Sequence, residues 1–157
     1  MAPFVNGLRE RGIAAAAIDL PRRKAEDAVG AFHAVVPPAA DVVVGGHSFG
    51  GRVASLAAAE PDAPYAALVL FSYPLHPPGG PERTEARIAH WPSIRCPVLL
   101  LSGESDPFAR FELLRAAVPM LASAELVTYP RLGRTLKPVL DDALDRVAVF
   151  LRSVSGA

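Results

Sequence analysis

The stretch VVVGGHSFGG (residues 42–51) is typical of a buried strand that turns sharply at a serine before a helix begins. Its G-x-S-x-G pattern places glycines at positions 46 and 50, on either side of Ser48. Such a turn is tight, so side chains two residues before or after the serine are expected to collide. The turn should lift the serine hydroxyl above the edge of a sheet. Ser48 is therefore a candidate nucleophile, the alternative being an incidental serine in a glycine-rich turn.

The two neighbours of Ser48 have different expected roles. The backbone N–H of Phe49 lies at the start of the predicted helix, where N–H groups point at developing negative charge, so it is a candidate oxyanion donor. The side chain of His47 must point away from that of Ser48, because successive residues alternate across a strand. We interpret His47 as a packing residue, with substrate contact as its other candidate role.

Apolar runs of strand length alternate with helix-like segments along the chain. The runs are continuous, as in strands covered on both faces, and predict strands at residues 13–20, 41–46, 66–74, 96–103 and 124–130. Apolar residues spaced by three and four predict helices at residues 2–12, 24–36, 51–60, 106–121 and 140–154. This order predicts an α/β fold, a three-layer α/β/α sandwich with a mostly parallel sheet, in a single domain of residues 1–157.

Composition and charge argue against several classes of protein. Sixteen Lys and Arg residues balance sixteen Asp and Glu residues, so neither nucleic acid nor a membrane surface is expected as a partner. No apolar run approaches the ~18 residues of a membrane span and no signal peptide is visible, so a cytoplasmic protein is expected. Cys96 is the only cysteine, which excludes an intrachain disulfide, and we expect it to pack as a small hydrophobe.

Asp106 follows the predicted strand 96–103 by a few residues, in the loop GESDPFA. An acid that supports a serine nucleophile arrives on such a strand-end loop, after the nucleophile in the chain. The same residue also suits the N-cap of a helix beginning at Pro107. The two roles are compatible.

A histidine is expected after the last strand, in YPRLGRTLKPVL (129–140), and none is there. All four histidines precede Asp106 in the chain. His76 follows the strand 66–74 at the sheet edge of Ser48, and His90 lies in the same crossover. A structural or substrate-contact role is favoured for both, with His76 as the first candidate for a substitute base. His33 is expected to be a packed core residue.

These motifs resemble the bacterial α/β-hydrolase-fold family related to NSL complex subunit 3 and testis-expressed protein 30, and more distantly the dienelactone hydrolases. The matching pieces run in order along nearly the whole chain: PFVNGLRERGIAAAAIDLP, VVVGGHSFGGRVAS, LVLFSYPLHPPGGPE, IAHWPSIRCPVLLLSGESDPF and GRTLKP. The resemblance implies a serine triad with Ser48 as nucleophile and Asp106 as acid. It implies an ester or similar acyl substrate and no metal or organic cofactor.

One departure from the family concerns the base. The family's last motif resembles G-x-H-x-L-K-P or G-H-S-L-K-P, whereas this chain has GRTLKP with Arg134 at the histidine position. A guanidinium stays protonated and cannot accept the serine proton. We expect Arg134 to approach the gap between Ser48 and Asp106, to form an ion pair with the acid, and to be a candidate substrate contact.

A second departure concerns the start of the chain. The family opens with a strand and a glycine-rich loop that supplies the other oxyanion N–H, whereas Met1 begins at the helix that follows. The strands 13–20 and 41–46 would flank that strand, so here they must pair directly, leave a gap, or expose edges that recruit another chain. We favour direct pairing, with a homodimer contact elsewhere as a second expectation.

The function that follows is a serine hydrolase on a shortened α/β-hydrolase fold, with weak or lost activity. The alternative is a non-catalytic interaction or scaffold protein on the same frame. A third interpretation is that the native chain begins upstream of Met1, which would restore the oxyanion loop but not the histidine.

Overall fold

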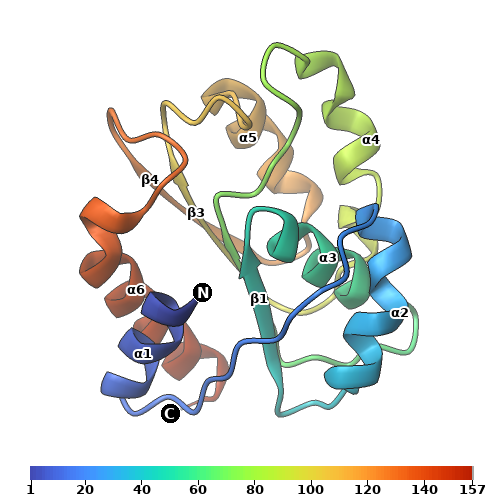
Figure 1. Ribbon diagram of the computed structural model, residues 1–157, viewed down its shortest axis with the longest axis vertical. Coiled ribbons are helices and arrows are strands. Elements are labelled where there is room, and N and C mark those ends of the chain that lie inside the picture. The colour runs from blue at the N-terminus through green and yellow to red at the C-terminus, as the bar shows by residue number, and fades with distance from the viewer. Residues whose placement is uncertain (157) are drawn as a thin grey trace.

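The computed structural model describes residues 1–156 and contains a parallel four-stranded sheet with helices on both faces (Figure 1). The strands lie in the order β1 (Val43–His47), β2 (Ala67–Phe71), β3 (Val98–Gly103) and β4 (Ala124–Tyr129), each parallel to the next. The helices are α1 (Ala2–Glu10), α2 (Ala25–Val35), α3 (Phe49–Ala58), α4 (Thr84–Ile88), α5 (Phe111–Ala117) and α6 (Leu140–Val154). Short 3₁₀ turns cover Pro81–Arg83, Trp91–Ser93, Val118–Met120 and Lys137–Val139. The predicted three-layer α/β/α architecture is confirmed.

The two central strands are buried on both faces, which explains their continuous apolar sequence. Leu68 and Leu70 of β2 face one layer of the core, which contains buried residues of α2, α3, α4 and α5. Val69 and Phe71 face the other layer, which contains buried residues of α6 and the apolar side of α1. Figure 1 shows α1 and α6 together on one side of the sheet and α2, α3 and α4 on the other.

The predicted strand 13–20 is absent, and this prediction was wrong. Residues 13–20 form no regular element and pair with no strand among the described residues. Their backbone is held by α1 instead: the Ile13 N–H donates to the Leu8 carbonyl, and the Ala15 carbonyl accepts from the Arg9 side chain. The sequence pattern was that of a strand, but a strand needs a neighbouring strand about 4.8 Å away. Among the described residues, no strand lies at that distance from residues 13–20.

The expected direct pairing of residues 13–20 with β1 is therefore also wrong, and the structure contains a gap. A depression of about 190 Å³ separates residues 13–16 from β1 and is lined on one side by α1. Within residues 1–156, β1 pairs only with β2, so it is an edge strand. The expected homodimer stays a prediction.

The helical prediction for residues 106–121 was too long. Residues 106–110 form a turn, and the helix covers only Phe111–Ala117 before a 3₁₀ turn. None of the helices described here combines the length and the apolar character needed to cross a bilayer.

Candidate active site

Ser48 occupies the turn between β1 and α3 in a left-handed backbone conformation, with φ of 55°. A non-glycine residue in this region costs about 1–3 kcal/mol, so surrounding contacts must hold it there. One of them is the hydrogen bond that the Ser48 N–H donates to the Phe71 carbonyl at 2.9 Å. The predicted placement of Ser48, between a strand and a helix at the carboxyl end of the sheet, is confirmed.

Close backbone approach explains two of the glycines around Ser48. A Cβ on Gly46 would lie 2.4 Å from the carbonyl carbon of Gly50, and one on Gly51 would lie 2.8 Å from the carbonyl oxygen of Gly46. A Cβ on Gly50 would meet no atom of the described chain within 4 Å. The prediction of a collision at Gly50, two residues after the serine, was therefore wrong. The crowded position is one residue later, because there the first turn of α3 crosses the end of β1.

Asp106 lies in the loop after β3, and its side chain is fully buried. Its Oδ1 accepts the N–H of Phe108 at 2.9 Å, which stabilises the turn that begins at Pro107. The interpretation of Asp106 as an N-cap is wrong, because the next helix does not begin until Phe111. Asp106 instead orders a non-helical turn at the sheet edge where Ser48 lies.

Arg134 lies between Ser48 and Asp106. Its Nη1 lies 3.1 Å and 3.3 Å from the two carboxylate oxygens of Asp106, and its Nη2 donates to the Ser48 hydroxyl. The guanidinium also lies over the Phe108 ring, 3.9 Å from its centroid. The predicted position of Arg134 and its ion pair with Asp106 are confirmed. Nη1 therefore contacts the carboxylate, and Nη2 contacts the serine hydroxyl.

Two residues that sequence reasoning missed hold the Arg134 loop in place. A Cβ on Gly103 would lie 2.2 Å from the Leu132 carbonyl oxygen, so only glycine lets this loop approach the end of β3. Ser72 is buried, has a φ of 51°, and donates its hydroxyl to the Arg134 carbonyl at 2.8 Å. Neither role has a signal in the sequence, because both depend on a contact between distant segments.

His47 is half-buried and packs where we expected. Its ring centroid lies 6.0 Å from that of Phe4 in α1, and its Nε2 lies 3.4 Å from the Arg134 carbonyl oxygen. Burial lowers the pKa of His47 below its usual range, which favours a neutral ring that donates this bond. Whether His47 also contacts a substrate stays a prediction.

His76 is not free to act as a substitute base. It is almost fully buried, and its Nδ1 lies 2.8 Å from the Pro77 carbonyl oxygen, to which it donates. Its Nε2 accepts the N–H of Arg110 at 3.0 Å. Both nitrogens are therefore used by the backbone, so His76 has a structural role. Whether it also contacts a substrate stays a prediction.

The two remaining histidines also have structural partners. His33 lies 3.1 Å from the hydroxyl of Tyr65 and is stacked beside its ring. The Nε2 of His90 lies 2.8 Å from the hydroxyl of Ser55, which itself donates to the Arg52 carbonyl. The Nε2 of His90 must therefore donate this bond. None of the four histidines is hydrogen-bonded to Ser48 in the part of the chain that the structure describes.

His90 should make the stability of the protein depend on pH. Burial, and secondarily the charge of Arg52, lower its pKa from 6.5 to about 4. Between pH 6.5 and about pH 4, His90 is protonated in the unfolded chain but stays neutral in the folded chain. The free energy of unfolding should therefore fall as the pH falls through this range. The loss should reach about 1–3 kcal/mol after allowance for solvent screening.

Urea denaturation of the wild type and of His90→Gln near pH 6.5 and near pH 4.5 measures this effect. The glutamine can still donate to Ser55 but does not titrate, so the wild type should lose more stability than the variant. Equal losses in both proteins would contradict the assignment.

The arrangement around Ser48 can stabilise negative charge but cannot take up a proton. Arg134 donates to the hydroxyl, and among the residues that the structure describes Asp106 accepts only from Arg134 and from the backbone. Phe49 is the first residue of α3, so its N–H has no acceptor within the helix and remains a candidate oxyanion donor. Within residues 1–156, no group of three His, Cys, Asp or Glu side chains could hold a metal ion.

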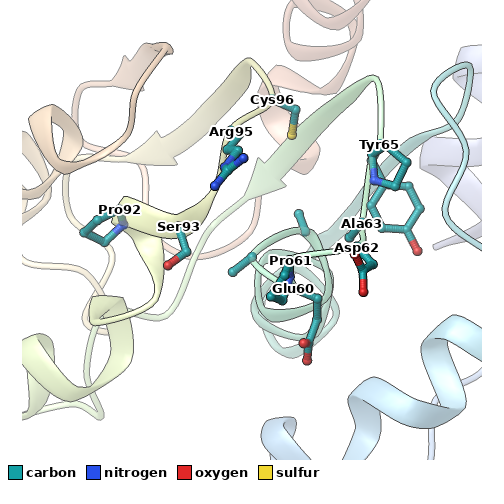
Figure 2. Close-up of a pocket in the computed structure, with 12 residues that line it drawn as sticks. Glu60, Pro61, Asp62, Ala63, Tyr65, Pro92, Ser93, Arg95 and Cys96 are labelled. Atoms are coloured by element: carbon teal, nitrogen blue, oxygen red, sulfur yellow. The ribbon is translucent and has the colours of Figure 1, made fainter.

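A depression of about 850 Å³ lies away from this site, at the amino ends of β2 and β3, whereas Ser48 lies at the carboxyl end of the sheet (Figure 2). It is lined by the end of α3, the loop before β2 and the loop before β3. Cys96 lines it, and burial raises the pKa of its thiol, which disfavours the reactive thiolate. The chemistry therefore places the candidate site at Ser48 and not in this larger depression.

Comparison with known proteins supports the fold around this site. Residues 19–149 match the family described as alpha/beta hydrolase domain. No curated protein sequence matches the chain.

Several solved structures share the fold. The chain superposes on a monoacylglycerol lipase from Paleococcus ferrophilus with a TM-score of 0.80 and 15% identity, over 96% of this chain and 88% of that one. Est1E from Butyrivibrio proteoclasticus, solved with ferulic acid bound, gives 0.81 and 17%, over 99% and 83%. A puromycin hydrolase gives 0.62 and 22%, over 83% of this chain and 24% of that one. At these identities the likeness is one of fold.

Proposed function

Because the chain belongs to the alpha/beta hydrolase domain family, we propose that it is a serine hydrolase of acyl substrates with Ser48 as nucleophile, and that Arg134 makes it slow. The observation that carries the proposal is the single guanidinium that contacts both the Ser48 hydroxyl and the Asp106 carboxylate. It lies where a triad would place the base. The narrower resemblance to relatives of NSL complex subunit 3 and testis-expressed protein 30 is part of the same proposal.

The reaction begins with attack by Ser48 Oγ on the acyl carbonyl carbon. A new C–O bond forms, the carbonyl electrons move onto its oxygen, and the Phe49 N–H stabilises that oxyanion. The oxyanion then collapses and expels the alkoxide, which takes a proton from solvent. Water then attacks the acyl-serine, which releases the acid and restores the Ser48 hydroxyl. Asp106 acts by orienting the Arg134 guanidinium.

The proton of Ser48 has to leave to solvent in this mechanism. Arg134 cannot take it, because a guanidinium remains protonated at any ordinary pH. By donating to Oγ, however, Arg134 stabilises the negative charge that develops on that oxygen. The attack should therefore depend on hydroxide in solution rather than on a side chain with a pKa near neutrality.

Hydrolysis of p-nitrophenyl butyrate by the wild type should be slow and should rise continuously with pH between about 6 and about 10. It should show no plateau near 6.5, where a histidine base would titrate. Ser48→Ala should abolish the part of the rate that exceeds the background in buffer. Rapid turnover with a plateau near neutral pH would mean that an unidentified base is at work.

A non-catalytic binding protein is the second candidate. The observation that favours it is that the groups contacting Ser48 offer no acceptor for its proton. In that case the wild type and Ser48→Ala would hydrolyse the ester at the same rate, equal to the background.

A further inference from the structure

We propose that Ser48 accepts a phosphoryl group from phosphate monoesters whose leaving group is an acidic alcohol such as a phenol, and that Arg134 stabilises the group during its transfer. The observation that carries the proposal is the guanidinium that donates to the Ser48 hydroxyl, at the place where acyl transfer needs a base. This activity goes beyond hydrolysis of acyl substrates, and neither reaction requires the other.

The orientation of the Arg134 guanidinium is fixed on three sides. Nη2 donates to Ser48 Oγ, Nη1 lies 3.1 Å and 3.3 Å from the two Asp106 oxygens, and the group lies 3.9 Å from the centroid of the Phe108 ring. A phosphorus atom bonded to Oγ would carry its oxygens beside Nη2. Guanidinium donors match the geometry of phosphate oxygens, so Arg134 would contact the group being transferred.

The cation of this ion pair is accessible from solvent and the anion is not. Ser48 is half-buried and 22% of the Arg134 side chain is exposed, whereas the Asp106 side chain has no exposed surface. An incoming phosphate therefore meets the guanidinium and the hydroxyl first. The carboxylate lowers the net charge of the pair, so we expect weak binding of the substrate and a high KM.

The missing base matters less for a phosphoryl group than for an acyl group. Acyl transfer forms a full bond from the serine oxygen to carbon, which requires the loss of the serine proton. The transition state for transfer from a phosphate monoester is loose, with little bonding to the nucleophile and with charge spread over the phosphoryl oxygens. Such a reaction depends on positioning and electrostatic stabilisation, which a fixed guanidinium supplies.

The leaving group has to depart as an anion, because the guanidinium at Ser48 does not give up a proton. This favours phenols over alkyl alcohols, since a phenolate is the more stable anion. Phe49 directly follows Ser48 in the chain and is 37% exposed, so its ring offers an apolar surface for an aryl group. The substrate class is therefore an aryl phosphate.

The transfer proceeds in two balanced steps. The bond from phosphorus to the phenol oxygen breaks, and its electron pair stays on the phenolate. A bond forms from Ser48 Oγ to phosphorus, and the serine proton passes to solvent. Water then attacks the phosphorus of the phosphoserine, which releases inorganic phosphate and restores the Ser48 hydroxyl.

The first test uses p-nitrophenyl phosphate near about pH 8.5, where an imidazole is uncharged. The wild type should release p-nitrophenolate faster than Ser48→Ala, a substitution that leaves the ion pair of Arg134 and Asp106 in place. After incubation with the substrate, mass spectrometry of the digested wild type should find phosphate on the peptide that contains Ser48. A rate equal to that of Ser48→Ala, or no phosphate on this peptide, would overturn the proposal.

The second test separates the two reactions by their response to position 134. Arg134→Gln and Arg134→His should each lower the release of p-nitrophenolate from the phosphate about 100-fold, or to the rate of Ser48→Ala. Arg134→His should at the same time raise hydrolysis of p-nitrophenyl butyrate, because an imidazole can act as a base. The matched control Arg95→Gln removes the same charge from an exposed arginine far from Ser48 and should leave the phosphate reaction unchanged.

Each outcome of the second test assigns the activity. A phosphate reaction that survives in Arg134→Gln, or falls equally in Arg95→Gln, would contradict the role of Arg134. Absence of ester hydrolysis in a wild type that transfers the phosphoryl group would contradict only the proposed function.

Discussion

Arg134→His is expected to raise the rate of ester hydrolysis about 100-fold near neutral pH. An imidazole at this position would lie between the Ser48 hydroxyl and the Asp106 carboxylate, where the guanidinium lies now. It could accept the serine proton while the carboxylate orients it, and general-base assistance contributes typically ~10²–10⁴-fold. We expect the lower end, and a low absolute rate, because Phe49 is the single oxyanion donor that we identify. A missing donor typically costs ~10²–10³-fold.

Measurement of kcat/KM against pH distinguishes this base from a general effect of removing arginine. The histidine variant should show a rise that levels off near about pH 6.5, unlike the wild type. Arg134→Gln, which also removes the charge but offers no base, should show no such step. The histidine variant combined with Ser48→Ala should return to background. An equal gain in the glutamine variant would show that Arg134 only obstructs the site.

Arg134→Met is expected to lower the free energy of unfolding by about 3–5 kcal/mol. The Asp106 side chain is fully buried, and removal of its partner would leave a carboxylate in the interior without a cation. The remaining Phe108 N–H bond at 2.9 Å compensates only in part. Chemical denaturation of the wild type and the variant measures the difference.

Two further variants test the cause of this loss. Arg146→Met breaks an ion pair with Asp142 in which both side chains are about half exposed, so it should cost no more than ~1 kcal/mol. Adding Asp106→Asn to Arg134→Met replaces the unpaired carboxylate with a neutral amide and should recover much of the lost stability. If Arg134→Met cost no more than Arg146→Met, the buried pair would not be holding the loop.

The candidate site was predictable where it depends on short-range chemistry. Ser48 and Asp106 each follow an apolar strand, and the carboxyl ends of parallel strands meet at one edge of the sheet. The replacement of histidine by Arg134 could be identified from the GRTLKP motif. The contacts of Ser72 and Gly103 with the Arg134 loop could not be predicted, because they join residues distant in the chain.

The sequence by itself determined the layered architecture. Continuous apolar runs dictate strands covered on both faces, and three- and four-residue spacing dictates the helices that cover them. The glycines around Ser48 dictate a sharp turn, although the structure moves the crowded position from Gly50 to Gly51. These features follow from local sterics and burial, which each segment carries in its own residues.

Only the tertiary structure decided which apolar segments became strands and which polar groups met. Residues 13–20 have the apolar character of a strand, yet they lie against α1 with a gap between them and β1. A strand is stabilised by hydrogen bonds to a neighbouring strand, so its formation depends on what lies beside it. The same holds for Arg134, whose position between Ser48 and Asp106 depends on the Leu132–Gly133 backbone packing against Gly103 and on the hydroxyl of Ser72.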